Sequence, residues 1–505
     1  MANLIRRPPT FEVQRWRKPP PHGNEDQNFS ERLRPGQVKA GMLAIWFLVA
    51  ALLLGGIRSA QDDTYYCLAE DNERYEYFGE LTSYENVRNQ RLPTKLPKCT
   101  PVALWSFISN GATYPDTSDY NSIALMQLQQ GIILNNSEKR NKLCHEDFDA
   151  IQNWTDGLRN WPPETLEPKY KSFINNLGQI YVNRYPEIFK SAYEEIFVRI
   201  SPRKNSKETY EEFKNGMNKA GFNVSTIYES VTPVAPVTTN CSQWDQSQLA
   251  KANEKRDEFR RGPEVSQMLK EINERLGFPK FGGLAMSDIE AMYKMCRLDR
   301  MFSNLTDSPW CAAFKPEHLK VLEYDEDLYS FYLSGYGNPL VDDMACPLLK
   351  NLMETLYNNT VNGTSPQSVL YFGDVTTLRY ILTGLGIVQD DDGRGLSPKP
   401  GPLLNERQWR LSVISPPLAN LAVVLYKCTF GVNYQLMFYL NDHPVDYKGC
   451  KVGLCNWNDI YNSFQTAIKS ESCDREVVCS ESSSAPVGYS TSLAWLVLVI
   501  SAVIY

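Results

Sequence analysis

Short apolar runs bounded by turn residues alternate along this chain with longer segments of helical spacing. Val102 to Ile108 and Ser368 to Phe372 are short and apolar, which is typical of buried strands in a parallel sheet. Two further runs, Leu421 to Leu425 and Tyr434 to Leu440, flank Gly431-Val432-Asn433. This arrangement predicts a β-hairpin near the end of the folded region.

Helical patterns occupy the middle of the chain. Good helix formers at helical spacing run from about Lys169 to Phe222, and a charged helical run extends from Gln246 to Leu276. Strands near both ends with helices between them predict an α/β core interrupted by a large helical insertion. We place this insertion, a helical cap, at roughly residues 140–345 within a folded region of residues 61–480.

The hydrophobic segment near the N-terminus is an unbroken apolar run from Gly41 to Ile57, and Arg32, Arg34 and Lys39 precede it. It is shorter than the roughly 20 residues that span a bilayer. The chain around it, residues 41–60, is therefore predicted to be a signal peptide or a signal anchor. Residues 1–40 are basic and rich in proline, and we expect them to be disordered.

A second apolar segment, Leu493 to Tyr505, ends the chain without a charged residue. Small residues, Ser482 to Ala485, and a spacer, Pro486 to Ser492, precede it. Residues 481–505 thus fit a glycosylphosphatidylinositol (GPI) attachment signal. The alternatives are a buried C-terminal strand or a weak membrane anchor. With the N-terminal segment, this pattern predicts a membrane association through a lipid or a signal anchor.

Cysteines and glycosylation sequons indicate the compartment. All 12 cysteines lie between Cys67 and Cys479, as in a disulfide framework built in an oxidising compartment. Cys450 with Cys455 and Cys473 with Cys479 are close enough for local loops, although spacing alone does not establish a bond. Seven Asn-x-Ser/Thr triplets follow residue 60, at Asn135, Asn153, Asn223, Asn240, Asn304, Asn358 and Asn362. We therefore expect a glycoprotein of the secretory pathway, at the cell surface or in the endoplasmic reticulum lumen.

The charge distribution argues against a nucleic-acid partner. The net charge is −7, and residues 1–39 hold eight Lys/Arg against four Asp/Glu, so the remaining chain carries −11. The folded region has three of the four histidines, His145, His318 and His443, and we expect each to be a surface or helix-capping residue. No pair of them has metal-ligand spacing, so neither a metal nor a cofactor is predicted.

Two short segments resemble the catalytic motifs of histidine phosphatases with their reactive residues replaced. Ile108 to Pro115 is similar to the Arg-His-Gly-x-Arg-x-Pro loop, and Leu370 to Leu378 to the distal His-Asp or His-Ala-Glu segment. Leu143 to Trp154 and Gln408 to Cys428 add further similarity, and the likeness spans most of residues 65 to 460. Together they resemble the multiple inositol polyphosphate phosphatase branch of the histidine acid phosphatases. This resemblance implies a phosphoglycerate-mutase-like three-layer α/β sandwich with an α-helical cap.

The same resemblance assigns the replaced positions. Asn110 stands where the family has its nucleophilic histidine, and Ser109 and Thr113 stand where it has phosphate-clamping arginines. Asp374 takes the place of the second histidine and Thr376 that of the proton-donating glutamate. An amide cannot form a phosphohistidine, and neutral hydroxyls cannot replace planar, charged donors. We therefore expect no functional catalytic residues.

Further phosphate contacts of the family are also substituted or uncertain in alignment. Ile180 falls where an arginine is expected, and alignment through Phe213 and Gly216 puts Asn205 at another arginine position, with Arg203 as the alternative. The leading hypothesis is a catalytically inactive pseudophosphatase that binds a phosphorylated small molecule, a protein or a glycan. The alternatives are an active phosphatase acting on phytate or 2,3-bisphosphoglycerate by an altered mechanism, and a structural or adhesive surface glycoprotein.

Overall fold

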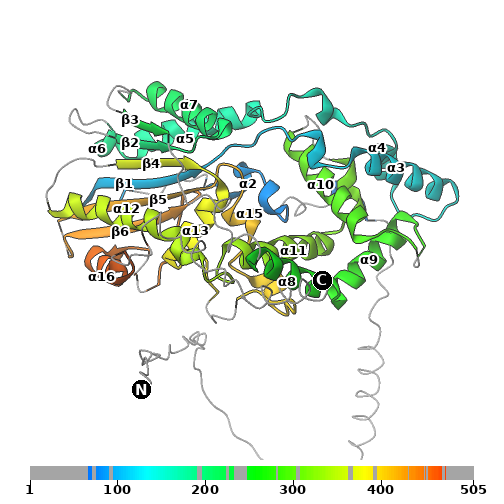
Figure 1. Cartoon of the computed structure of the whole chain (residues 1–505). Coiled ribbons are helices and arrows are strands. Elements are labelled where there is room, and N and C mark those ends of the chain that lie inside the picture. Colours follow the sequence, from blue (N-terminus) through cyan, green and yellow to red (C-terminus); the bar gives the residue numbers. More distant parts are fainter. Residues whose placement is uncertain are drawn as a thin grey trace, which may run out of the picture. The chain divides into compact units, whose positions relative to one another are not determined.

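The computed structural model describes most of the chain between residues 66 and 473, and all of these residues belong to one unit, Tyr65–Tyr505 (Figure 1). The described ranges are 66–70, 76–89, 95–189, 196–222, 227–231, 247–279, 282–302, 308–361, 368–390, 395–429, 431–448, 450, 453–468 and 473. The predicted N-terminal tail, the signal segment and the C-terminal GPI-type signal lie outside these ranges. Within the ranges, no helix is both long enough and apolar enough to cross a membrane.

A single mixed sheet forms the centre of the molecule. Its strands follow the order β3-β2-β4-β1-β5-β6-β7, and β8 pairs with β6. The strands are β1 (Cys99–Ser109), β2 (Ile196–Ile200), β3 (Ile227–Val231), β4 (Ser368–Gly373), β5 (Asn420–Cys428), β6 (Tyr434–Leu440), β7 (His443–Pro444) and β8 (Cys455–Asn456). Strands β3, β2, β4 and β1 run parallel, and β5 and β6 form the antiparallel hairpin. The four strands and the hairpin predicted from the apolar runs are confirmed.

Helices cover both faces of this sheet. Successive side chains of a strand point to opposite faces, so each central strand contacts both helical layers. On β1, the Trp105 indole Nε1 donates to Asn351 of one helical layer at 3.1 Å, while Ser106 Oγ lies 2.8 Å from the Tyr181 hydroxyl of the other. The helices nearest the sheet are α5 (Pro168–Arg184), α6 (Pro186–Phe189), α7 (Lys204–Lys219), α12 (Val341–Val361), α13 (Val375–Leu385) and α16 (Trp457–Ile468). The predicted three-layer sandwich is confirmed.

Helices α5 and α7 cross at two glycines. A Cβ at Gly178 would overlap the backbone carbonyl of Phe213, and a Cβ at Gly216 would overlap that of Asn175. Only residues without a side chain permit this close approach of the two backbones. The crossing packs the C-terminal half of α7 directly on α5.

A second group of helices lies at one end of the sheet, to the right in Figure 1. It comprises α3 (Ser122–Ser137), α4 (His145–Gln152), α8 (Leu249–Arg260), α9 (Pro263–Leu276), α10 (Met286–Phe302) and α11 (Pro316–Ser334). Shorter elements connect these parts: α2 (Tyr84–Val87), α14 (Leu403–Glu406), α15 (Leu411–Ile414), η1 (Leu68–Glu70), η2 (Gly79–Leu81), η3 (Thr117–Asp119), η4 (Gly157–Asn160) and η8 (Pro309–Ala313).

The predicted boundaries of the cap, residues 140–345, are wrong. Strands β2 and β3 and helices α5 and α7 fall within that span but belong to the sandwich core. The buried positions of β2 alternate as Ile196, Val198 and Ile200, a period of two that lies between two helical patterns. The cap is thus built from two separate stretches of chain, one before and one after this part of the core.

Five disulfides join cysteines of the described ranges. They are Cys67–Cys144, Cys99–Cys428, Cys296–Cys311, Cys346–Cys473 and Cys450–Cys455. The local Cys450–Cys455 loop considered from spacing is present. The other local pairing is wrong, because Cys473 bonds to Cys346 of α12 rather than to Cys479.

The sequons differ in accessibility. Asn153 and Asn358 are exposed, whereas Asn135 is 4% exposed and its amide donates to the Leu276 carbonyl at 3.0 Å. A glycan on Asn135 would have to displace this buried hydrogen bond. The folded structure therefore does not favour the glycosylation predicted for Asn135. The remaining four sequons lie outside the described residues: Asn223, Asn240, Asn304 and Asn362.

Candidate functional site

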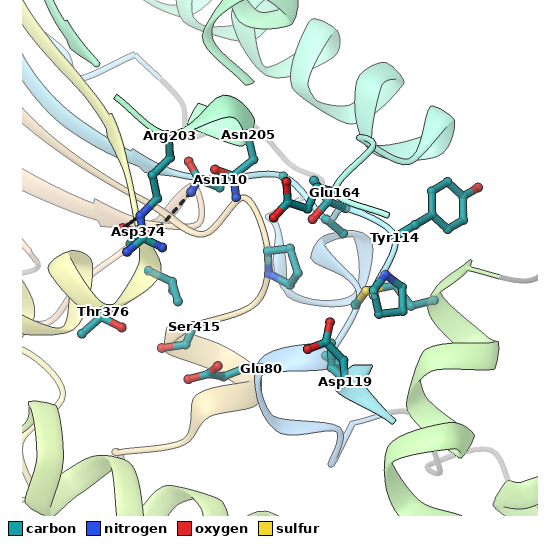
Figure 2. A pocket seen from close by; sticks show the side chains of 18 of the residues that line it. Glu80, Asn110, Tyr114, Asp119, Glu164, Arg203, Asn205, Asp374, Thr376 and Ser415 are labelled. Carbon is teal, nitrogen blue, oxygen red and sulfur yellow. Dashed lines mark hydrogen bonds and ion pairs between the residues drawn. The ribbon is translucent and has the colours of Figure 1, made fainter. Parts of the chain in front are cut away.

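A cavity of about 860 Å³ lies where three parallel strands end. Asn110 follows β1, Asp374 follows β4, and the loop after β2 leads to Arg203 at the start of α7. The carboxyl ends of parallel strands are the usual location of ligand sites in α/β folds. Figure 2 shows these three side chains converging on one side of the cavity.

Asn110 is fixed by its backbone and by its side chain. Its amide N–H donates to the Gly373 carbonyl at 3.0 Å, and its own carbonyl accepts from Leu418 at 2.9 Å. The Ser206 hydroxyl donates to Asn110 Oδ1 at 2.8 Å, and Asn110 Nδ2 donates to Asp374 Oδ1 at 3.2 Å. Both ends of the amide are therefore engaged by the protein itself.

Asp374 is the residue before the first turn of α13, and its second carboxylate oxygen faces Arg203 (Figure 2). Arg203 Nε lies 3.2 Å from Asp374 Oδ2. Burial raises the pKa of Asp374, and the nearby guanidinium offsets part of that rise. We call Ser206, Asn110, Asp374 and Arg203 the Asn110 network. In it, the one arginine that lines the described cavity already faces a carboxylate.

The remaining wall of the cavity is rich in carboxylates. Four more acidic residues line it, against one further cation, Lys294; the acids are Glu80, Asp116, Asp119 and Glu164. Asp116 and Asp119 belong to a capping box at η3, and hydrogen bonds from Ser118 hold the pKa of Asp116 below its usual value. Asp116 therefore stays ionised at neutral pH.

Glu80 is a wall carboxylate with a buried cationic partner. It pairs with Arg379 of α13, whose Nη2 donates to the Thr376 hydroxyl at 2.9 Å. Aromatic rings complete the wall: Tyr114 stacks on Trp161 with 4.8 Å between ring centroids and contacts Phe302 at 5.2 Å. The cavity thus combines carboxylates with a wall of buried aromatic side chains.

Six of the eight residues singled out in the sequence line this cavity: Asn110, Thr113, Arg203, Asn205, Asp374 and Thr376. Ser109 does not, because it is the last, fully buried residue of β1 and its hydroxyl has no partner. Ile180 does not either; it lies on α5 beside Leu177 and Tyr84, at a separate small pocket. The structure therefore brings together both replaced motifs but leaves these two positions outside.

The histidines are not part of the cavity lining in the described structure. His145 is exposed at the start of α4, and His443 Nε2 lies 3.0 Å from the Val87 carbonyl. His318 is 2% exposed, so the prediction that it is a surface residue is wrong. The capping reading is right, because His318 Nδ1 accepts a hydrogen bond from Lys315 at the start of α11.

Some residues of the site carried no recognisable signal in the sequence. Ser206 and Thr209 lie on one face of α7, where Thr209 Oγ1 accepts from the Gly111 amide at 3.0 Å. Glu80 in η2 and Glu164 in the loop before α5 lie far from either motif in the sequence. Asp116 and Asp119 directly follow the first motif, and that position was the only available hint.

One group of potential metal ligands occurs among the described residues. Cys67, Cys144 and Glu146 come within 4.8 Å of one another. The two sulfur atoms are joined in a disulfide, so they offer no thiolate. This group is therefore not a metal site.

Comparison with known proteins identifies the family. The family model described as histidine phosphatase superfamily (branch 2) matches residues 165–441, more than half of the chain. The chain is 29% identical over 436 residues to multiple inositol polyphosphate phosphatase 1 of Drosophila melanogaster, covering 83% of this chain and 91% of that protein. It is 23% identical to the Homo sapiens protein of the same name, over 80% of this chain and 88% of that protein.

Solved structures share the fold. The phytase from D. castellii superposes with a TM-score of 0.62 at 17% identity, over 79% of this chain and 87% of that one. The multiple inositol polyphosphate phosphatase of Bifidobacterium longum, in complex with inositol hexasulfate, gives 0.56 at 13% identity, over 78% and 99%. At these identities the likeness is one of fold.

Proposed function

Because this chain belongs to branch 2 of the histidine phosphatase superfamily, we propose that it is an inositol-polyphosphate-phosphatase-like protein that has lost catalysis and kept a binding cavity. The observation that carries this proposal is the Asn110 network. The family resemblance puts the nucleophile at Asn110 and a second histidine at Asp374, and here these two side chains hydrogen-bond to each other at 3.2 Å.

The missing nucleophile is the first argument. The family mechanism passes through a phosphohistidine, so it needs an imidazole with a free lone pair. Asn110 offers an amide whose nitrogen lone pair is delocalised, and its oxygen already accepts from Ser206. The cavity lining in the described structure includes no histidine that could replace it.

The missing positive charge is the second argument. A phosphoryl transition state is stabilised by positioned cations, and removal of a single such donor typically costs on the order of 10²–10³ in rate. Thr113 stands at one arginine position of the family motif, and Arg203 faces Asp374 rather than empty space. Several such losses in one site leave no detectable rate by the family mechanism.

Assay of phosphate release from phytate and 2,3-bisphosphoglycerate by the purified full chain tests this proposal. We expect no release above the heat-inactivated chain, while an active phytase in the same buffer releases phosphate. The double variant Asn110→Ala/Asp374→Ala is the matched control. Release by the native chain that this double variant lacks would overturn the proposal.

A gain-of-function variant sharpens the same test. Asn110→His, Thr113→Arg, Asp374→His and Thr376→Glu together restore the family residues at four positions that line the cavity. Ser109 is left unchanged because its side chain is buried away from the cavity. Phosphate release by this variant alone would identify the four replacements as the cause of inactivity.

We also propose that the protein is a disulfide-bonded glycoprotein of the secretory pathway, held at the cell surface or in the endoplasmic reticulum lumen. Five disulfides within the described ranges and the exposed sequons at Asn153 and Asn358 support this compartment. Release of the protein from intact cells by a phosphatidylinositol-specific phospholipase would support the GPI anchor. Retention after this treatment would instead favour the N-terminal signal anchor.

A further inference from the structure

The charges around the cavity are unsuited to a polyanionic ligand. Five carboxylates and two cations line it. Arg203 is matched by Asp374, and Glu80 is matched by Arg379 from outside the lining. The charges that remain are those of Asp116, Asp119 and Glu164 against the single cation Lys294.

These carboxylates come from separate parts of the fold. Glu80 lies in η2, Asp119 in η3, Glu164 in the loop before α5, and Asp374 at the start of α13. Figure 2 shows the four side chains around a common space rather than along one solvated helix face. A cavity of about 860 Å³ lies within the range of small-molecule sites.

An unpartnered hydroxyl independently indicates a ligand. Ser415 lines the same cavity, is 1% exposed, and its Oγ has no hydrogen-bond partner in the described structure (Figure 2). Buried hydroxyls are normally hydrogen-bonded, because an unmade bond costs about 1–3 kcal/mol. A polar group brought by a ligand would satisfy Ser415, and none of the carboxylates does.

The apolar part of the lining suits the stem of an organic cation. Leu81, Val375 and Pro417 are half-buried and line the same cavity as the carboxylates. A cation on an aliphatic stem gains from carboxylates at its charged ends and from apolar contact along its length. The start of α13 would attract an anion through its helix dipole, but Asp374 already occupies that position with its own negative charge.

From this arrangement we propose that the cavity binds an organic polycation of the polyamine class. The ammonium groups lie against Asp116, Asp119 and Glu164, the aliphatic stem lies against the half-buried apolar lining, and an N–H donates to Ser415 Oγ. This assignment rests on the proposed loss of catalysis, because an active site for phosphate esters would need the opposite charge.

Calorimetric titration of the purified full chain with spermine tests the assignment, with phytate and neutral myo-inositol titrated in parallel. We expect spermine to bind and the other two not to bind. The double variant Asp119→Asn/Glu164→Gln should weaken spermine binding by about tenfold or more, equivalent to about 1.4 kcal/mol. Ser415→Ala should weaken it by severalfold, because it removes only the hydroxyl.

A charge-matched control separates the cavity from the general acidity of the surface. Glu254→Gln/Glu258→Gln removes two exposed carboxylates of α8 that do not line the cavity, and it should leave spermine binding unchanged. The assignment is overturned if spermine does not bind, if either cavity variant binds it as well as the native chain, or if the control weakens binding equally. Binding of phytate without turnover would overturn the polycation assignment alone, whereas phosphate release would overturn the proposed loss of catalysis.

Discussion

Two regions of this molecule differ in how their arginine side chains are buried and paired. Between α11 and the loop before α15, Arg407 Nη2 lies 2.8 Å from Glu323 Oε2, and Arg407 Nε lies 2.6 Å from Asp327 Oδ2. All three side chains are at most 2% exposed, and we call them the Arg407 cluster. In the cavity, by contrast, Arg203 is 68% exposed and carboxylates outnumber cations.

The difference follows from the cost of burying charge. A buried carboxylate must be paired, so each acid of the Arg407 cluster has a guanidinium within hydrogen-bond distance. In the open cavity Asp116, Asp119 and Glu164 are exposed, so water solvates their carboxylates and they need no buried cation. Two further buried arginines, Arg275 and Arg297, likewise pair with Asp147 and Glu326 inside the cap rather than lining the cavity.

Breaking the Arg407 cluster should have the largest effect on stability. Arg407→Met removes the guanidinium from Asp327 and leaves Glu323 with Arg410 only. Removing one partner of a buried ion pair typically costs about 3–5 kcal/mol. Denaturant unfolding of the two chains measures this difference. A loss below about 1 kcal/mol would mean that water reaches these carboxylates, and the contrast between the two regions would no longer hold.

A buried carboxyl with a raised pKa should give a smaller effect that depends on pH. Burial, aided by Asp156, raises the pKa of Asp299 to about 6, although Trp154 and Ser308 donate to it. Between pH 4 and 6 the folded chain keeps a proton that the unfolded chain releases. The contribution of Asp299 to the free energy of unfolding is therefore fully present below about pH 4. It decreases by about 3 kcal/mol as the pH rises to about 6.

The variant Asp299→Asn isolates this contribution, because an amide can still accept from Trp154 and does not titrate. We expect the free energy of unfolding of the native chain, relative to the variant, to decrease from pH 4 to pH 7. Parallel curves for the two proteins over this range would show that Asp299 keeps an ordinary pKa.

The core strands could be predicted from the sequence because their local pattern and their burial agree. Val102 to Ile108 and Ser368 to Phe372 are apolar on both faces, as central parallel strands require. Strand β2 was missed because Phe197 and Arg199 face outward in a stretch of only five residues between helices. A period of two over such a short length is easily absorbed into neighbouring helical patterns.

The site was predictable only where a motif carried it. Asn110 and Asp374 follow recognisable segments, and they do meet at the ends of their strands. Ser109 could not be placed, because one residue's difference along β1 moves a side chain from the cavity to the interior. The acidic wall could not be predicted from the sequence, because tertiary folding alone brings Glu80 and Glu164 to the cavity.

Removing the amide from the Asn110 network should cost less than either change above. Asn110→Ala loses a hydrogen bond from Ser206 and one to Asp374, and such bonds contribute about 0.5–1.5 kcal/mol each. We expect a loss of about 1–2 kcal/mol in denaturant unfolding. Combining it with Ser206→Ala should add little, because both variants remove the same contact; strict additivity would contradict the network.

The smallest effect should come from Arg203, the cavity counterpart of Arg407. Its pair with Asp374 is largely solvated, and such pairs contribute about 0.2–1 kcal/mol and weaken in salt. Arg203→Met should therefore change the free energy of unfolding by less than about 1 kcal/mol. A double-mutant cycle with Asp374→Asn should give a coupling energy in the same range. This coupling energy should decrease as salt is added. A coupling as large as the Arg407 loss would place this arginine among the buried structural cations, because a solvated pair cannot supply that much energy.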